Sequence, residues 1–361
     1  LLCISFFHLA NVFLPLLICR LNFESLFMPV IASHYRPPFL LANGYVQSIL
    51  PTLIRRIDTS HFERERITTS DDDFLDLDWS RTDSAGGNNS APGCGGKTLL
   101  IISHGLEGHS RRPYVAGIVR DANAKGWDAL AWNFRSCSGE MNKTLRFYHS
   151  GATDDLERVI EHAHQLGYQS IHLVGFSMGG NLSLLYAGRK GRDIPVHVKS
   201  VCVFSVPCDL AASSKRLAER KNKIFMWRFL KDLRVKIEVK ALDFPQQVSA
   251  EDYHKIKNFQ QFDDRYTAPI HGFDDAADYW EKSSCKPVLK DIRIPALLVN
   301  AENDPFLAPE CFPYEEAKAS EWLTLEVPKS GGHVGFIDIN CDNSYWMERR
   351  VVDFVTAIIK G

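Results

Sequence analysis

The sequence lacks an excess of charge of either sign. Its 361 residues include 42 Lys and Arg against 44 Asp and Glu, which gives a formal net charge of −2 at pH 7. A surface without a strong positive field does not attract a polyanion, so the composition argues against nucleic acid as a partner. We therefore expect a small or apolar ligand.

The sequence also lacks a C-x-x-C pair among its nine cysteines. An odd number of cysteines cannot all form disulfides within one chain, and cysteines scattered in this way do not have the spacing of a zinc site. We therefore expect free thiols in a reducing compartment, which favours a cytoplasmic protein, and no metal site.

The N-terminus lacks the marks of a secretory signal. The run LLCISFFHLANVFLPLLIC, interrupted by the polar residues His8 and Asn11, is nearly long enough to span a bilayer. No basic residue precedes it, no A-x-A-like cleavage site follows it, and the chain opens with Leu. Two interpretations of this apolar leader, residues 1–33, stay open: a membrane anchor, or an upstream extension of a protein that starts at Met28.

The rest of the sequence alternates between short apolar runs and helical patterns, which predicts a mostly parallel sheet with helices on both faces. Residues 67–79 alternate apolar and polar positions and predict two half-exposed antiparallel strands, and the Gly-, Asn- and Ser-rich residues 84–96 predict a surface loop. A helix is expected at the end of the chain, over 345–359. The runs expected to form parallel strands are TLLIISHG, DALAWNFR, SIHLVGFS, SVCVFSVP, IPALLVNAEN and LTLEVP.

The alternation stops between residues 207 and 287. A segment of about eighty residues is too long for a simple connection between a strand and a helix. We therefore predict an inserted cap at residues 207–290, which divides the core into a first part at 34–206 and a second part at 291–361.

The pentapeptide GFSMG, Gly175 to Gly179, directly follows the apolar run IHLV and precedes a helical pattern. It matches the G-x-S-x-G elbow, in which a sharp strand-to-helix turn exposes a nucleophilic serine. Small residues on either side let strand and helix approach each other. We predict Ser177 as the nucleophile; the alternative is a Gly-Ser turn without chemistry.

A serine hydroxyl needs a base, and the base needs an acid to fix its tautomer. In this fold the chain order is serine, acid, histidine. His333 lies in a glycine-flanked segment after the run LTLEVP, and Asp304 follows the run IPALLVN. We predict His333 as the base and Asp304 as the acid, with Glu302 and Asp209 as competing acids.

The two N–H groups expected to bind an oxyanion are those of Leu106 and Met178. Leu106 lies in HGLEG after an early strand, and Met178 follows the nucleophile at a helix start, where negative charge is favoured. His104 precedes the nucleophile and borders a strand, so we expect it to brace the loop. His149 and His271 are assigned the same structural role.

Seven motifs follow one another along the sequence: HGLEG, NFRSCSGEMN, RFYHSGATDDL, GFSMGGN, FDDRYTAPIHGFDDAADYW, NAENDPF and GGHVGF. Together they resemble the motifs of the YheT-type α/β-hydrolases, whose eukaryotic relatives are membrane-anchored abhydrolase-domain lipases and esterases. The resemblance implies the α/β-hydrolase fold, a catalytic triad of Ser177, Asp304 and His333, and carboxylesterase or lipase activity on short- to medium-chain acyl esters. One departure is Ser136, where the family usually has glycine.

The first part of the cap, residues 211–240, carries ten Lys or Arg against three acidic residues, with apolar residues between them. This composition describes a basic amphipathic helix, and it suits a lipid surface. The competing interpretation, which we favour, is a solvated helix that packs its apolar side on the sheet. Contact with a membrane surface is therefore expected only through the leader or this helix.

The expected function is hydrolysis of a carboxylic ester or lipid through an acyl-enzyme, without a cofactor. Thioesterase or amidase action on the same three residues remains an alternative, because the motifs do not distinguish these acyl-transfer reactions. The other alternative is a non-catalytic ligand-binding protein on the hydrolase scaffold. Such proteins typically lose a member of the triad, whereas all three residues are present here.

Overall fold

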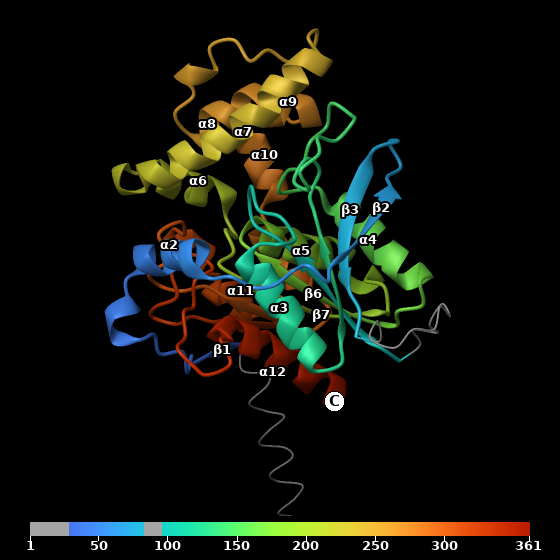
Figure 1. Cartoon of the computed structure of the whole chain (residues 1–361). Helices are drawn as coiled ribbons and strands as arrows, with labels where there is room; N and C mark the ends of the chain where they lie inside the picture. Colours follow the sequence, from blue (N-terminus) through green and yellow to red (C-terminus); the bar gives the residue numbers. More distant parts are fainter. Residues whose placement is uncertain (1–28, 83–95) are drawn as a thin grey trace, which may run out of the picture.

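The computed structural model describes residues 29–82 and 96–361, so the leader up to Met28 and most of the expected loop at 84–96 lie outside the described residues. A nine-stranded sheet forms the centre of the molecule, with the strand order β1-β9-β8-β7-β6-β4-β5-β3-β2 (Figure 1). Its pairs are parallel except those made by β3. The strands are β1 (Val30–Ile31), β2 (Glu63–Thr68), β3 (Phe74–Ser80), β4 (Thr98–Ser103), β5 (Asp128–Trp132), β6 (Ser170–Phe176), β7 (Val198–Phe204), β8 (Ala296–Val299) and β9 (Leu323–Glu326).

Strands β2 and β3 differ from the expected half-exposed pair, because every residue of β3 is buried. Its alternating polar positions include Asp76 and Asp78, whose carboxylates accept hydrogen bonds from Arg66 and Arg64 of β2. A buried carboxylate is tolerated when a guanidinium pairs with it through two hydrogen bonds. The expectation of exposure failed because an alternating pattern does not reveal which partner covers the polar face.

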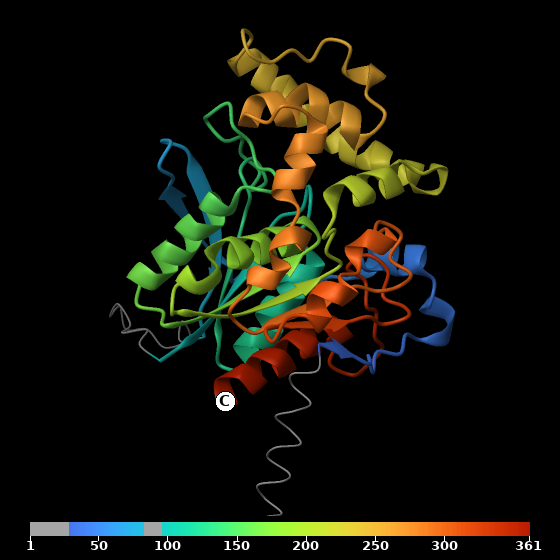
Figure 2. The same cartoon turned by 180° about the vertical axis from the view of Figure 1, so that it is seen from behind.

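Helices cover both faces of the sheet (Figures 1 and 2). On one face, α3 and α12 bury apolar side chains such as Ile118 and Val351 against β4 to β8. On the other face, α4 and α5 do the same with side chains such as Leu156 and Leu182. The expected α/β-hydrolase architecture, with a mostly parallel sheet between two helical layers, is therefore confirmed. The helices of these layers are α3 (Pro113–Ala124), α4 (Thr153–Gln165), α5 (Met178–Lys190), α11 (Tyr314–Lys318) and α12 (Trp346–Lys360).

The segment between β7 and β8 is helical and gathers beyond the strand ends (Figures 1 and 2). It has an apolar cluster of its own, to which Leu230, Phe262 and Trp280 contribute. The basic stretch 211–240 is not one helix but two, and α7 buries its apolar side in this cluster rather than on the sheet. The α-helices of this segment are α6 (Leu210–Ala218), α7 (Lys223–Asp243), α8 (Phe259–Phe262), α9 (Ala268–His271) and α10 (Ala276–Ser283).

A further helix, α2 (Gly44–Ile54), lies between β1 and β2 in the chain and follows the cap residue Asn43, whose side chain accepts from two backbone N–H groups. Short turns connect the elements, and none of the described helices has the length and apolarity needed to cross a membrane. The short helical turns are η1 (Phe39–Leu41), η2 (Gly191–Asp193), η3 (Arg220–Asn222), η4 (Tyr253–Lys255), the π-helical η5 (Asp263–Thr267), η6 (Lys286–Asp291) and η7 (Pro309–Cys311).

Candidate active site

Ser177 lies at the turn between β6 and α5 and has a left-handed backbone, with φ 52° and ψ −118°. A serine pays for this conformation with strain, which the surrounding structure must enforce. The glycines around it explain how the turn closes. A Cβ on Gly175 would lie 2.5 Å from the carbonyl oxygen of Gly179, and one on Gly179 would collide with the carbonyls of Ser103 and His104.

Three side chains that are far apart in the sequence form one hydrogen-bonded chain. Nε2 of His333 lies 2.9 Å from Oγ of Ser177, and its Nδ1 lies 2.9 and 3.1 Å from the two oxygens of Asp304. A carboxylate accepts only, so Nδ1 donates to Asp304 and Nε2 is left to accept from the serine hydroxyl. This is the arrangement in which an imidazole can remove the serine proton.

Three other side chains fix the loop that carries His333. Oγ of Ser48 in α2 accepts from the His333 N–H at 2.7 Å, and Oγ of Ser205 after β7 accepts from the Val334 N–H at 2.9 Å. The side chain of Asn303 accepts from the N–H of Gly332, the residue before His333. The sequence does not identify Ser48 and Ser205 as positioning residues, because their partners lie far along the chain.

The competing acids lie elsewhere. The Asp209 side chain accepts from the N–H of Ala212 and caps the start of α6, and Glu302 is exposed. Asp304 is 2 % exposed, and one of its oxygens also accepts from the N–H of Phe306 at 2.9 Å. The structure therefore brings Asp304 to His333 and employs Asp209 as a helix cap.

Leu106 and Met178 border the same cavity as Ser177. Met178 is the first residue of α5, and the first N–H groups of a helix have no partner within it. Leu106 lies in a turn that is held by the Tyr114 hydroxyl, which accepts from the N–H of Gly105 at 3.0 Å. The assignment of these two N–H groups to an oxyanion remains a prediction.

His104 is fully buried, and this burial lowers its pKa to about 3. Its Nδ1 lies 2.7 Å from the carbonyl oxygen of Gly105, and its Nε2 accepts from the N–H of Phe134. A neutral ring with both nitrogens engaged braces the loop, as expected from the sequence. Burial also lowers the pKa of His149 and of His271, whose ring centroids lie 4.5 Å apart.

Ser136, the departure from the family motif, has a φ of 63°. This left-handed conformation is one that glycine adopts without cost, so the backbone at this position favours glycine over serine. The serine uses the turn for a contact of its own, because its Oγ accepts from the Asn142 N–H and donates to the Asn142 side chain at 2.6 Å.

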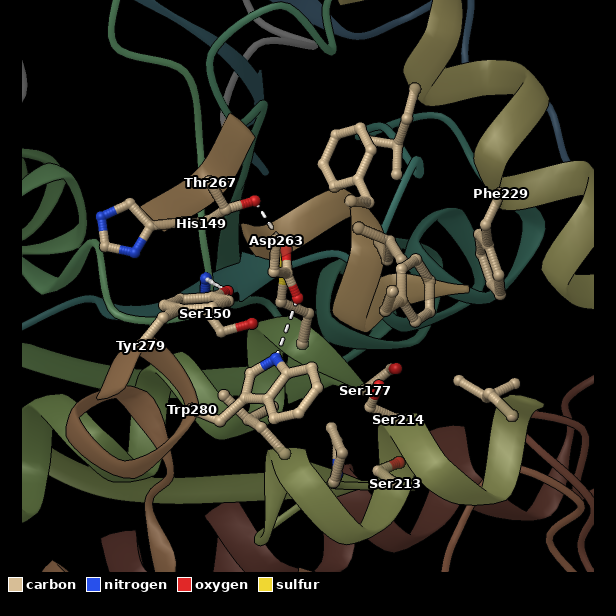
Figure 3. Close-up of a pocket in the computed structure, with 18 of the residues that line it drawn as sticks. His149, Ser150, Ser177, Ser213, Ser214, Phe229, Asp263, Thr267, Tyr279 and Trp280 are labelled. Carbon is tan, nitrogen blue, oxygen red and sulfur yellow. Dashed lines mark hydrogen bonds between the residues drawn. The ribbon is translucent and has the colours of Figure 1, made fainter. Parts of the chain in front are cut away.

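An apolar cavity opens from Ser177 into the helices between β7 and β8 (Figure 3). One carboxylate, that of Asp263, faces it; Thr267 and Trp280 donate to its oxygens at 2.6 and 2.8 Å. Burial raises the pKa of Asp263 to about 7. Nothing in the sequence distinguishes this aspartate from its neighbour Asp264. The apolar lining comprises Leu106, Phe147, Met178, Leu210, Leu217, Phe229, Leu233, Phe259, Phe262, Trp280 and Phe306.

A second cavity also reaches Ser177 and His333. It runs between α2, which contributes Pro51 and Thr52, and the first half of α7, which contributes Phe225. The serine therefore lies where two cavities meet, one lined mainly by apolar side chains of the inserted helices, the other also by charged side chains such as Arg55 and Arg112.

A mostly parallel sheet with helices on both faces, and a serine at a strand-to-helix elbow within reach of a histidine and an acid from later strand ends, defines the class of α/β-hydrolase-fold proteins. The model of the α/β hydrolase fold family matches residues 98–338. The chain belongs to this family, and the relatives that it matches are of the esterase and lipase type.

Its relatives are consistent with that membership. The chain is 31% identical to the YheT protein of Escherichia coli (strain K12) over 324 residues, which is 89% of this chain and 92% of YheT. It is 30% identical to human phospholipase ABHD3 over 335 residues, 92% of this chain and 81% of that protein. The structure of the Pyrococcus furiosus esterase Pf2001 aligns with a TM-score of 0.54 at 15% identity, covering 90% of this chain and all of that one, and shares the fold.

Proposed function

We propose that this protein is a serine carboxylesterase or lipase that hydrolyses short- to medium-chain acyl esters through an acyl-enzyme on Ser177. One observation carries the proposal: the hydrogen-bonded chain from Asp304 through His333 to Ser177 ends at the opening of an apolar cavity. Such a cavity accepts an acyl chain, because removal of apolar surface from water is favourable.

The first half-reaction follows from this geometry. His333 Nε2 removes the hydroxyl proton as Ser177 Oγ attacks the ester carbonyl, and Asp304 stabilises the imidazolium that results. The N–H groups of Leu106 and Met178 donate to the oxyanion. Collapse of the tetrahedral intermediate breaks the bond to the alcohol oxygen, and the alcohol leaves with the proton that His333 returns.

The second half-reaction repeats these steps with water as the nucleophile. His333 removes a proton from the water, the hydroxide oxygen attacks the acyl carbon, and the carboxylic acid leaves as Ser177 recovers its proton. This chemistry needs the three side chains and two N–H groups alone, so the proposal includes no cofactor.

The test is a substrate panel of p-nitrophenyl esters of graded chain length beside acyl-CoA thioesters and acyl amides. We expect esters to be the preferred class and Ser177→Ala to lose several orders of magnitude in kcat, because nucleophile and base act as a unit. Circular dichroism of the variant controls for the fold. A preference for thioesters or amides would change the substrate class, and ester hydrolysis that survives in Ser177→Ala would contradict the proposal.

A further inference from the structure

Helix α7 carries apolar side chains on two opposite sides, one packed and one exposed. Its inner side buries Met226, Leu230, Leu233 and Ile237 in the cluster of inserted helices. Its outer side leaves four large apolar side chains in solvent: Ile224 is 75 % exposed, Trp227 64 %, Val235 57 % and Leu242 81 %. Single exposed apolar residues are ordinary, but a row of them along one side of a helix marks a binding surface.

Helix α2 presents a similar row. Val46, Ile49 and Leu53 recur at helical spacing and are exposed, whereas Gln47 on the opposite side is fully buried. The preceding turn adds Phe39 and Leu40, which are more than four-fifths exposed. None of these side chains belongs to the three apolar clusters of the described core.

The two helices meet at the mouth of the second cavity. The rings of Tyr45 in α2 and Phe225 in α7 stack with centroids 6.2 Å apart, and residues of both helices line the path to Ser177. Both views show α2 on the same side of the molecule as α6 and the start of α7 (Figures 1 and 2). We call the exposed residues Val46, Ile49, Leu53, Ile224, Trp227 and Val235 the α2–α7 surface.

Cations surround this surface on the α7 side. Lys223 and Lys231 are exposed, and neither takes part in a salt bridge among the described residues, although Lys231 Nζ lies 5.4 Å from the Trp227 ring centroid. Arg228 and Arg234 add two more cations, each with an acid one turn later on the helix. Exposed Trp and Ile interleaved with Lys and Arg is the composition of helices that lie in the lipid–water interface.

We propose that the α2–α7 surface binds a lipid bilayer that contains anionic phospholipid, with the second cavity opening towards that bilayer. Trp227 and Ile224 enter the headgroup region, and the free cations of α7 pair with lipid phosphates. A second copy of this chain fits less well, because a two-fold contact would bring the cations of the two α7 helices together. Binding by this surface does not depend on the proposed ester hydrolysis.

The experiment uses the full chain with Ser177→Ala, so that lipid hydrolysis cannot change the vesicles. The vesicles contain brominated phosphatidylcholine, which quenches tryptophan fluorescence, alone or mixed with phosphatidylglycerol. The contribution of Trp227 is the difference in quenching between this protein and the same protein with Trp227→Phe. We expect quenching at Trp227 that requires phosphatidylglycerol and is lost at high salt. This readout reports contact at α7 whatever the leader does.

A charge variant and a matched control test the cations. With Lys223→Glu and Lys231→Glu together, the lipid concentration for half-maximal quenching should rise by at least roughly 30-fold, because each cation near an anionic surface contributes about fivefold. Lys125→Glu with Lys290→Glu makes the same charge change at exposed positions ahead of β5 and β8, and should leave quenching unchanged. Thermal melting verifies the fold of each variant.

Four outcomes would overturn the proposal. If no vesicle quenches Trp227, this side chain does not contact lipid. Equal quenching by neutral and anionic vesicles would show that the cations of α7 do not contribute to binding. Equal losses in the charge variant and its control would show an effect of net charge rather than of this surface. Sedimentation velocity without lipid tests whether a second copy of this chain occupies the surface. A dimer that the substitution Trp227→Ser dissociates would assign the surface to that second copy.

Discussion

Asp304 and Asp209 both follow strands of the sheet, but only Asp304 contacts His333. We predict that Asp304→Asn lowers kcat for ester hydrolysis by roughly three to four orders of magnitude, because an amide no longer holds the imidazole in the reactive tautomer. Asp209→Asn should lower kcat much less, since it changes only the cap of helix α6. Steady-state kinetics of the two purified variants decides, and reversed losses would contradict the assignment.

Asp263 gives a residue-scale prediction about stability. Burial raises the pKa of its carboxyl from the ordinary 3.8 to about 7. Between these values the folded chain holds a proton that the unfolded chain has released, so the free energy of unfolding falls as the pH rises through this window. The decrease is on the order of 1.4 kcal/mol per pH unit.

The substitution Asp263→Asn removes this proton while keeping the shape of the neutral acid. We expect the free energy of unfolding of the variant to fall less steeply than that of the wild type from about pH 4 to about pH 7. Urea titrations at several pH values within the window measure both slopes. Parallel slopes for the two proteins would show that Asp263 is ionised throughout this range.

The residues predicted from the sequence and those missed by it differ in one respect. Ser177, Asp304 and His333 could be proposed because each follows a recognisable strand, and the carboxyl ends of parallel strands lie along one edge of a sheet. Ser48 and Ser205 could not be proposed from the sequence. Each holds the histidine loop through a backbone N–H 285 or 129 residues away, and a serine in isolation carries no sign of such a partner.

At the scale of elements, α7 is tied to the core by a buried lysine. Lys240 is fully buried, and its Nζ donates to the carbonyl oxygens of Asn142, at 2.8 Å, and Thr144. We predict that Lys240→Met lowers the free energy of unfolding by about 3 kcal/mol, because two buried carbonyls lose a charged donor. Lys290→Met, at an exposed position, is the control for loss of a lysine. Chemical denaturation of both variants measures the difference, and equal stabilities would rule out this role for Lys240.

The break between α6 and α7 shows why one helix was expected and two were found. The side chain of Asn222 donates to the carbonyl oxygens of Arg216 and Pro305, which holds the chain in a turn before α7 begins. Pro305 lies in the loop after β8. The local sequence of the segment is compatible with a continuous helix, and the contact that interrupts it is tertiary.

At the scale of the whole molecule, the order of strands and helices follows from the alternation of patterns, because parallel strands joined by helices admit few topologies. The position of the inserted helices could not be derived in this way. Their apolar cluster closes over the strand ends and forms the wall of the cavity at Ser177. The cavity therefore depends on packing between segments that no motif describes, and the boundaries of the cap and the role of the leader remain predictions.

The central claim is that Ser177 becomes acylated, and the most direct measurement is covalent labelling. A fluorophosphonate reacts with an activated serine hydroxyl and releases fluoride, which leaves a stable phosphonyl-serine. After labelling of the full chain and proteolysis, mass spectrometry should find the adduct on the peptide that contains Ser177. It should be absent from Ser177→Ala and form far more slowly in His333→Ala, which lacks the base. A folded protein that remains unlabelled, or an adduct on another serine, would contradict the account.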